Sequence, residues 1–242
     1  MADERARLAS ELTSLLKLAA PPLGIAFRAE TEVPGVDRYA ARPPAPTADG
    51  RTGAVPAGCG FWFKAVDGAF STIAEDHANC SVGSYTHGFK RLEEVADKAD
   101  VAALVGSGWV SEADFPKVAA VKERPGAIVY GPLADLAVEP DVVFLRLNAK
   151  QAMLIDDALG GVRFEGKPQC HIVAIAKDQG EPAISVGCML SRVRTGMSNN
   201  ELTCAIPAAR LGVVVAALRR NAGTERTVAA YAAQDAARFA RA

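Results

Sequence analysis

The hydrophobic positions along the chain follow two different periods, which predicts a mixture of helices and strands. Near the N-terminus, Leu8, Leu12 and Leu16 recur at helical spacing, and Pro21-Pro22 ends that helix. Helical patterns or helix-start signals also occur over residues 58–66, 92–104, 149–159, 207–220 and 224–241, and near residue 111. Short β-prone runs indicate strands over residues 23–27, 69–73, 128–130, 142–147 and 183–186, whereas residues 170–176 fit a helix or a strand. This alternation predicts an α/β fold, a mixed sheet with helices packed on it.

One long segment has neither pattern. Residues 31–57 are rich in proline, glycine, alanine and threonine, so they are expected to form a connection between elements. Loops of this length are uncommon in compact domains unless they cover a site, which makes the segment a candidate cover.

Composition and charge limit the classes of function. The chain has 242 residues, half of them hydrophobic, which is enough for one domain with a sizeable core. Its 27 basic residues nearly balance its 28 acidic residues, so there is no electrostatic case for binding nucleic acid. No apolar run is long enough for a membrane span, and early acidic residues argue against a secretory signal. A soluble, cytoplasmic protein is expected, and the sequence leaves open whether it forms a homo-oligomer.

Two segments of the chain resemble each other. Residues 59–88 and 170–196 each begin with cysteine and carry a second cysteine, Cys80 or Cys188, followed eight residues later by glycine. A strand that begins after proline precedes each segment. The pattern suggests one domain over residues 1–242 with two similar halves, about 1–125 and 126–242, related by a pseudo-two-fold axis. Chance similarity in a chain rich in alanine and glycine is the alternative.

Several motifs carry a family resemblance. They are IAEDHANCSVGSYTHG at 73–88, PDVVFLRLNAKQAM at 140–153, SVGCMLSR at 185–192 and NNELTCAIP at 199–207, together with Cys59 and Cys170. With them the chain resembles, over most of its length, the bacterial and archaeal family called domain of unknown function 169, or ArCR. Members of that family often have proline directly after the cysteine of the first motif, where this chain has Ser81. The resemblance implies no established activity, so function is argued from the residues.

The five cysteines offer the most informative chemistry. Their odd number and the lack of an export signal argue against a disulfide framework, so reduced thiols are expected. If the two halves face each other, four thiolates meet and can hold a 4Fe–4S cluster or zinc. An iron–sulfur cluster is favoured over zinc, because the ligands lie far apart in sequence among apolar residues. Simple packing in the core is the alternative. The four proposed ligands are Cys59, Cys80, Cys170 and Cys188, and Cys204 is expected to lie outside the group.

His77 is the candidate catalytic residue. It belongs to the ionisable cluster Glu75-Asp76-His77 and lies three residues before Cys80. Histidine beside carboxylates can move protons near neutral pH. A solvated strand end or a helix cap is the alternative for the two carboxylates.

These residues support three competing functions. The first is a protein holding a cysteine-ligated iron–sulfur or metal centre, a reductase of a small molecule that takes electrons from a donor. The second is a non-catalytic small-ligand-binding or sensor module with structural cysteines or zinc. The third is an enzyme whose nucleophile Cys80 is activated by His77. No GxGxxG, P-loop, HExxH or GxSxG motif in a suitable setting favours nucleotide binding or the common hydrolase chemistries.

Overall fold

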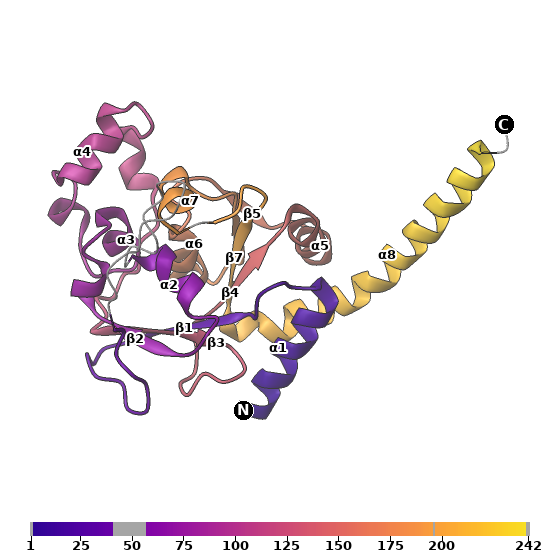
Figure 1. Ribbon diagram of the computed structural model, residues 1–242, viewed down its shortest axis with the longest axis horizontal. Helices are drawn as coiled ribbons and strands as arrows, with labels where there is room; N and C mark the ends of the chain where they lie inside the picture. Colours follow the sequence, from indigo (N-terminus) through magenta and orange to yellow (C-terminus); the bar gives the residue numbers. More distant parts are fainter. Residues whose placement is uncertain (1, 41–56, 196, 241–242) are drawn as a thin grey trace.

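A seven-stranded mixed sheet forms the centre of the computed structural model, which describes residues 2–40, 57–195 and 197–240 (Figure 1). The strands are β1 (Leu23–Arg28), β2 (Phe70–Thr72), β3 (Ala127–Pro132), β4 (Val142–Leu147), β5 (Arg163–Glu165), β6 (Ala183–Ser185) and β7 (Leu202–Pro207). Their order is β2-β3-β1-β4-β7-β6-β5, and neighbours are antiparallel except β5 and β6, which are parallel. The expected α/β class with a mixed sheet is confirmed.

The central strand β4 is apolar on both faces. Side chains alternate across a strand, so Val143 and Leu145 point to one side of the sheet and Val142 and Phe144 to the other. All four are buried. A strand of this composition requires a cover on each face, and the helices supply two covering layers.

The first layer consists of α1 (Ala2–Leu16), α5 (Ala149–Leu159) and α8 (Leu211–Phe239). Local signals fix both ends of α5. Asn148 and Gln151 form a capping box, with side-chain to backbone distances of 3.0 and 2.7 Å. Gly160 ends the helix in the left-handed conformation at φ 71°. These signals explain why the predicted range 149–159 matches the observed helix.

The opposite face is covered by α2 (Gly58–Lys64) and α6 (His171–Ala174), which continues into the π-helical turn η4 (Ile175–Gln179). Trp62 of α2 packs on Phe144 with ring centroids 4.2 Å apart. Shorter elements lie beyond this layer: η1 (Ala74–His77), α3 (Ser81–Thr86), η2 (Leu92–Glu94), α4 (Ala99–Gly106), η3 (Glu112–Lys117) and α7 (Met189–Thr195) (Figure 1). They build the candidate site described below.

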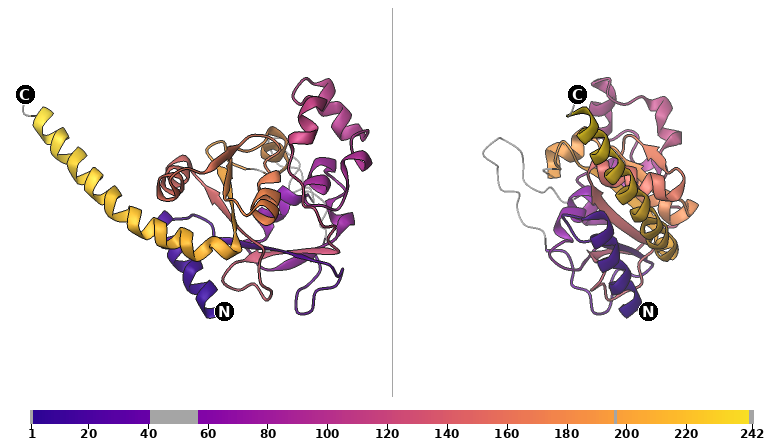
Figure 2. Two further views of the ribbon diagram at one scale, coloured as in Figure 1. Left: turned by 180° about the vertical axis from the view of Figure 1, so that it is seen from behind. Right: turned by 90° about the vertical axis from the view of Figure 1, so that its right-hand side faces the viewer.

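The end of α8 extends away from the rest of the molecule (Figure 2). Its buried residues all lie between Leu211 and Leu218, whereas exposed residues predominate from Thr224 onward. Across the described ranges, we find no helix with the length and apolar character needed to cross a bilayer.

Several expected elements differ from the observed ones. Pro207, expected in the first turn of a helix, ends β7 instead, and the short helix η5 (Ala208–Arg210) leads into α8. The two helices expected over 207–220 and 224–241 are one continuous helix. The expected helix over 92–104 is divided into η2 and α4. Strands β5 and β7 and helix α7 were not predicted. Of the expected connection 31–57, residues 41–56 lie outside the described residues.

The sheet order bears on the proposed internal repeat. Outward from the central pair β1 and β4, the order is β1-β3-β2 on one side and β4-β7-β6 on the other. In the first half, the two repeat cysteines lie in α2 and directly before α3. In the second half, they lie directly before α6 and α7. Strand β5, at the end of the order, has no counterpart on the other side. The axis itself, and the division into halves, stay predictions.

The exposed end of α8 gives a first test. Removing residues 227–242 should shift the melting temperature by no more than about 2 °C, because loss of exposed groups rarely changes stability by more than about 0.5 kcal/mol. Circular dichroism melting of the full and shortened chains measures the shift. Removing residues 211–242 is the matched control and should unfold the protein, since Val214 and Val215 are fully buried. A large loss on the shorter deletion would contradict the expectation.

Candidate functional site: a thiol-lined pocket

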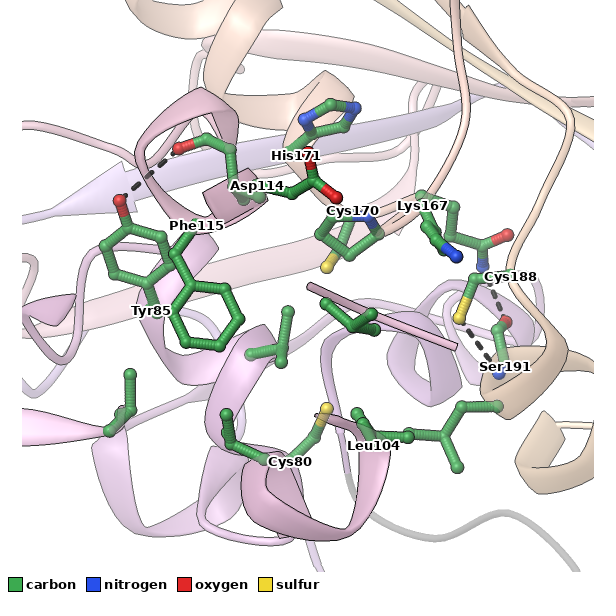
Figure 3. A pocket seen from close by; sticks show the side chains of 18 of the residues that line it. Cys80, Tyr85, Leu104, Asp114, Phe115, Lys167, Cys170, His171, Cys188 and Ser191 are labelled. Carbon is green, nitrogen blue, oxygen red and sulfur yellow. Dashed lines mark hydrogen bonds between the residues drawn. The ribbon is translucent and has the colours of Figure 1, made fainter. Parts of the chain in front are cut away.

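A cavity of about 240 Å³ lies on the side of the sheet covered by α2 and α6 (Figure 3). One wall comes from residues 80–118 and the other from residues 165–194. The cavity is larger than the roughly 150 Å³ that takes up benzene and smaller than the pockets of about 300–1,000 Å³ that hold drug-sized ligands. It therefore suits a small organic molecule. Most lining side chains are apolar, among them Val82, Val101, Leu104, Trp109, Phe115 and Leu190.

Four cysteines from separate segments line this pocket: Cys59 in α2, Cys80 at the start of α3, Cys170 before α6 and Cys188 before α7. Figure 3 shows the sulfur atoms of Cys80, Cys170 and Cys188 directed toward one space. Cys204 lies in β7 and packs into the opposite core with α1, α5 and α8. The structure thus brings together the four thiols that the sequence grouped and places the fifth elsewhere.

The sulfur atoms already take part in local hydrogen bonds. Cys80 and Cys188 occupy equivalent positions, because each Sγ accepts a hydrogen bond from the backbone N–H three residues later, at 3.4 Å in both cases. The Sγ of Cys170 accepts a hydrogen bond from the hydroxyl of Thr86 at 3.1 Å. These bonds hold three thiols against the pocket wall.

Burial keeps the thiols protonated. It raises the pKa of Cys59 to about 12, with a further contribution from the neighbouring Cys80 and Cys188. The pKa of Cys170 is also raised well above its ordinary value, first by burial and then by Cys80. Arg194 opposes the effect at Cys59 and Cys80 without cancelling it. Because the thiolate is the nucleophile and the metal ligand, neutral thiols are poor at both tasks.

The expected iron–sulfur or metal centre is wrong. Within the described ranges, no group of three or more His, Cys, Asp or Glu side chains is placed so that it could hold a metal ion. The four cysteines line a cavity rather than converge on one point, whereas zinc requires every sulfur at about 2.3 Å. The expected reductase therefore lacks a set of metal ligands among the described residues. The same finding applies to the zinc alternative.

His77 is not part of the pocket lining. Its ring lies in the aromatic core, with two phenylalanine ring centroids 4.9 and 4.7 Å away. Its Nε2 is 3.0 Å from the hydroxyl of Thr72. Burial, and then the nearby His87, lowers the pKa of His77 well below its ordinary value, so the ring is neutral at pH 7. Among the described residues it makes no hydrogen bond to the thiol of Cys80. Its role as a proton donor stays a prediction.

Other residues considered in the sequence lie partly inside and partly outside the pocket. Phe61 and Trp62 are fully buried in the core beneath it. His171 lines the pocket, and its Nε2 is 3.3 Å from Oε2 of Glu165. Burial lowers the pKa of His171, and Glu165 partly opposes that shift. The carboxylate thus lies close to the ring, although neither ring nitrogen has a hydrogen-bond partner among the described residues.

Gln169 and Ser191 were missed in the sequence. Gln169 is only 1% exposed and its Nε2 donates to Oγ of Ser191 at 2.6 Å. Its Oε1 has no hydrogen-bond donor in the part of the chain that the structure describes. Buried amides normally have every group paired, and this oxygen, like both ring nitrogens of His171, departs from that rule among the described residues. No periodic pattern could reveal it, because a loop and a short helix bring the two residues together.

The fold and pocket define an α/β protein with a mixed sheet between two helical layers and an apolar, thiol-lined cavity on one side. The chain belongs to the domain of unknown function 169 family, described as uncharacterised ArCR, whose model matches residues 11–217. No curated protein and no solved structure matches the chain. The matched range contains the whole sheet and every pocket residue, and the exposed end of α8 lies beyond it.

Gly58, next to Cys59, tests how tightly the region below the pocket is packed. A Cβ at Gly58 would lie 2.5 Å from Cε1 of His87, whose side chain is fully buried. Gly58→Ala should therefore lower the free energy of unfolding by about 1–3 kcal/mol, measured by urea denaturation. Gly106→Ala is the matched control, because its Cβ would meet nothing within 4 Å, and stability should be unchanged or slightly higher. Equal effects at both positions would contradict this packing.

The raised thiol pKa values predict slow alkylation. At pH 7.5, Cys80 should react with iodoacetamide at least about tenfold more slowly than a free cysteine peptide, because burial favours the protonated thiol. The rate should rise with pH beyond 9, as the thiolate forms. Peptide mapping by mass spectrometry gives the rate at each cysteine, and the urea-unfolded chain is the control in which all five should react rapidly. Rapid, selective reaction of native Cys80 near pH 7 would instead support the nucleophile hypothesis.

Proposed function

We propose that this protein is a non-catalytic module that binds a small, mainly apolar molecule in the thiol-lined pocket. The observation that carries the proposal is the cavity itself, which combines mainly apolar walls with a smaller number of polar groups. This combination is typical of ligand sites, in which apolar walls supply affinity and a few polar groups fix the orientation. The protonated thiols fit this role as small, polarisable parts of the wall.

One of the two walls of the pocket is suited to move when a ligand enters. The wall over residues 80–118 consists of short helices, and α4 rests mainly on α3 rather than on the sheet. Segments with few buried contacts open at low free-energy cost. The opposite wall follows the sheet through β5 and α6 and provides a fixed surface. A ligand could thus enter by displacement of one wall, a change that a sensor module can transmit.

The pocket also contains a tryptophan, Trp109, whose fluorescence can report ligand binding. The chain has two tryptophans, Trp62 and Trp109. Trp109 lines the cavity, whereas Trp62 is fully buried against Phe144 in the core. A ligand in the cavity should therefore change the fluorescence of Trp109 and leave that of Trp62 as a constant background.

The proposal is tested with neutral aromatic fragments slightly larger than benzene, with 2-phenylacetamide as the reference probe. We expect Kd values of about 0.1–1 mM, as is usual for ligands of this size. Leu104→Trp fills the cavity and should weaken binding at least tenfold. Val213→Trp adds the same bulk at a position of α8 that is 60% exposed, and should bind as the unaltered protein does. Tryptophan fluorescence and ligand-observed NMR measure the affinity.

Two outcomes would overturn the proposal. One is the absence of binding by any fragment at millimolar concentration. The other is equal binding by the unaltered protein and Leu104→Trp, since the fragments would then occupy another surface. Both tryptophan variants must melt as the unaltered protein does, which excludes unfolding as the cause of lost binding.

A further inference from the structure

Some charged side chains that line the pocket have no oppositely charged partner within the described ranges. The carboxylate of Asp114 forms an ion pair with Lys117 at 2.7 Å. Glu165 pairs with Arg163, which lies outside the lining. Two lining cations remain, Lys167 and Arg194, and neither forms an ion pair within the described ranges.

Lys167 is occupied by another group. Its ammonium donates to the backbone carbonyl of Trp109 and lies 4.9 Å from the centroid of the same residue's indole ring. A hydrogen bond and a cation–π contact together hold this charge at the rim. Arg194 is therefore the lining cation with the most free hydrogen-bonding capacity.

Arg194 is half-buried near the end of α7 and has one bond that fixes its direction. Its Nη1 donates to the backbone carbonyl of Asn79 at 3.0 Å, which draws the guanidinium toward Cys80. A side-chain hydrogen bond from Arg194 also acts to lower the pKa of Cys80. Because sulfur is only a weak acceptor, the guanidinium keeps further N–H groups for a stronger partner. A guanidinium presents paired donors in one plane, the arrangement that matches the two oxygens of a carboxylate.

A second polar group lies beside this cation. Ser191 and Arg194 are three residues apart on α7, so they share one face of the helix. Gln169 is tied to Ser191 and keeps its buried Oε1 without a donor within the described ranges. Gln169, Ser191 and Arg194 thus form one polar corner of the pocket. The rest of the lining is mainly apolar, with further charged or polar side chains at Asp114, Lys117, Glu165, Lys167 and His171. An unpaired cation and an unpaired acceptor at the same corner point to a ligand that supplies both an anion and a donor.

We propose that the natural ligand is a small organic monocarboxylate with an apolar body, whose carboxylate pairs with Arg194 and whose neighbouring hydroxyl or N–H group donates to Oε1 of Gln169. This inference rests on the proposed binding function and specifies its ligand class. Of the two lining cations without an ion pair within the described ranges, Lys167 is engaged by Trp109, so Arg194 is the one matched to a single negative charge. A phosphate monoester would bring a second charge into a mainly apolar cavity, and an uncompensated buried charge is costly.

The test compares two probes of the same shape, phenylacetate and 2-phenylacetamide. The unaltered protein should bind the acid at least about tenfold more tightly than the amide, because a hydrogen bond to a charged group contributes more than a neutral one. Arg194→Gln should remove this preference by weakening phenylacetate about ten- to a hundredfold while the amide binds as before. Arg194→Lys keeps the charge and should retain part of the preference. Isothermal titration calorimetry gives all the affinities.

Two controls complete the design. Arg238→Gln removes the same charge on the exposed end of α8 and should keep the full preference for the acid. Mandelate, which adds a hydroxyl beside the carboxylate, should bind more tightly than phenylacetate, and Gln169→Met should abolish that gain. Melting temperatures of all variants show that each is folded.

The outcomes separate this inference from the function on which it rests. If both probes bind equally and Leu104→Trp blocks both, the pocket binds ligands but the carboxylate assignment fails. If the preference for the acid survives in Arg194→Gln, the anion is held elsewhere and the assignment also fails. If neither probe binds, both proposals are overturned.

Discussion

The structure depends on the burial of both faces of β4. Because Val142 and Phe144 point to one side and Val143 and Leu145 to the other, neither face of the sheet can be left to water. On one side, α1, α5 and α8 provide the cover. On the other side, α2 and α6 must pack against the strand, and Trp62 fixes the position of α2. This requirement places the N-terminal ends of these two short helices, with their cysteines, over the middle of the sheet.

The same requirement decides the chemical state of the thiols. Helices short enough to fit over the sheet leave a space above them, and the segments over residues 80–118 and 165–194 enclose it with apolar side chains. A thiol in such surroundings loses the hydration that a thiolate needs, so the pKa of Cys59 and Cys170 rises. Four cysteines around one cavity therefore form part of a wall, and two of them, Cys80 and Cys188, also cap helices through their sulfur atoms.

The polar corner gives the pocket its direction. An apolar cavity alone would hold many small molecules with little discrimination, whereas a guanidinium and an open amide oxygen favour one orientation. Arg194 and Ser191 come from α7, and Gln169 comes from the loop that leads into α6. Helix α7 packs on α2, and Arg194 is further held by its bond to the carbonyl of Asn79. The wall that rests less on the sheet contributes mainly apolar surface.

The sequence by itself determined the α/β class, most of the strands and the helices with strong local signals. The range of α5 was predictable because its capping residues and terminal glycine act within one turn, and β4 because its apolar run is uninterrupted. It also grouped the four pocket cysteines and separated Cys204 from them. Only the tertiary structure decided that these thiols line a cavity instead of holding a metal, since the distance between side chains from four segments depends on how those segments pack. For the same reason the unpaired oxygen of Gln169 had no signal in the sequence, because a missing partner is a property of the packed neighbourhood.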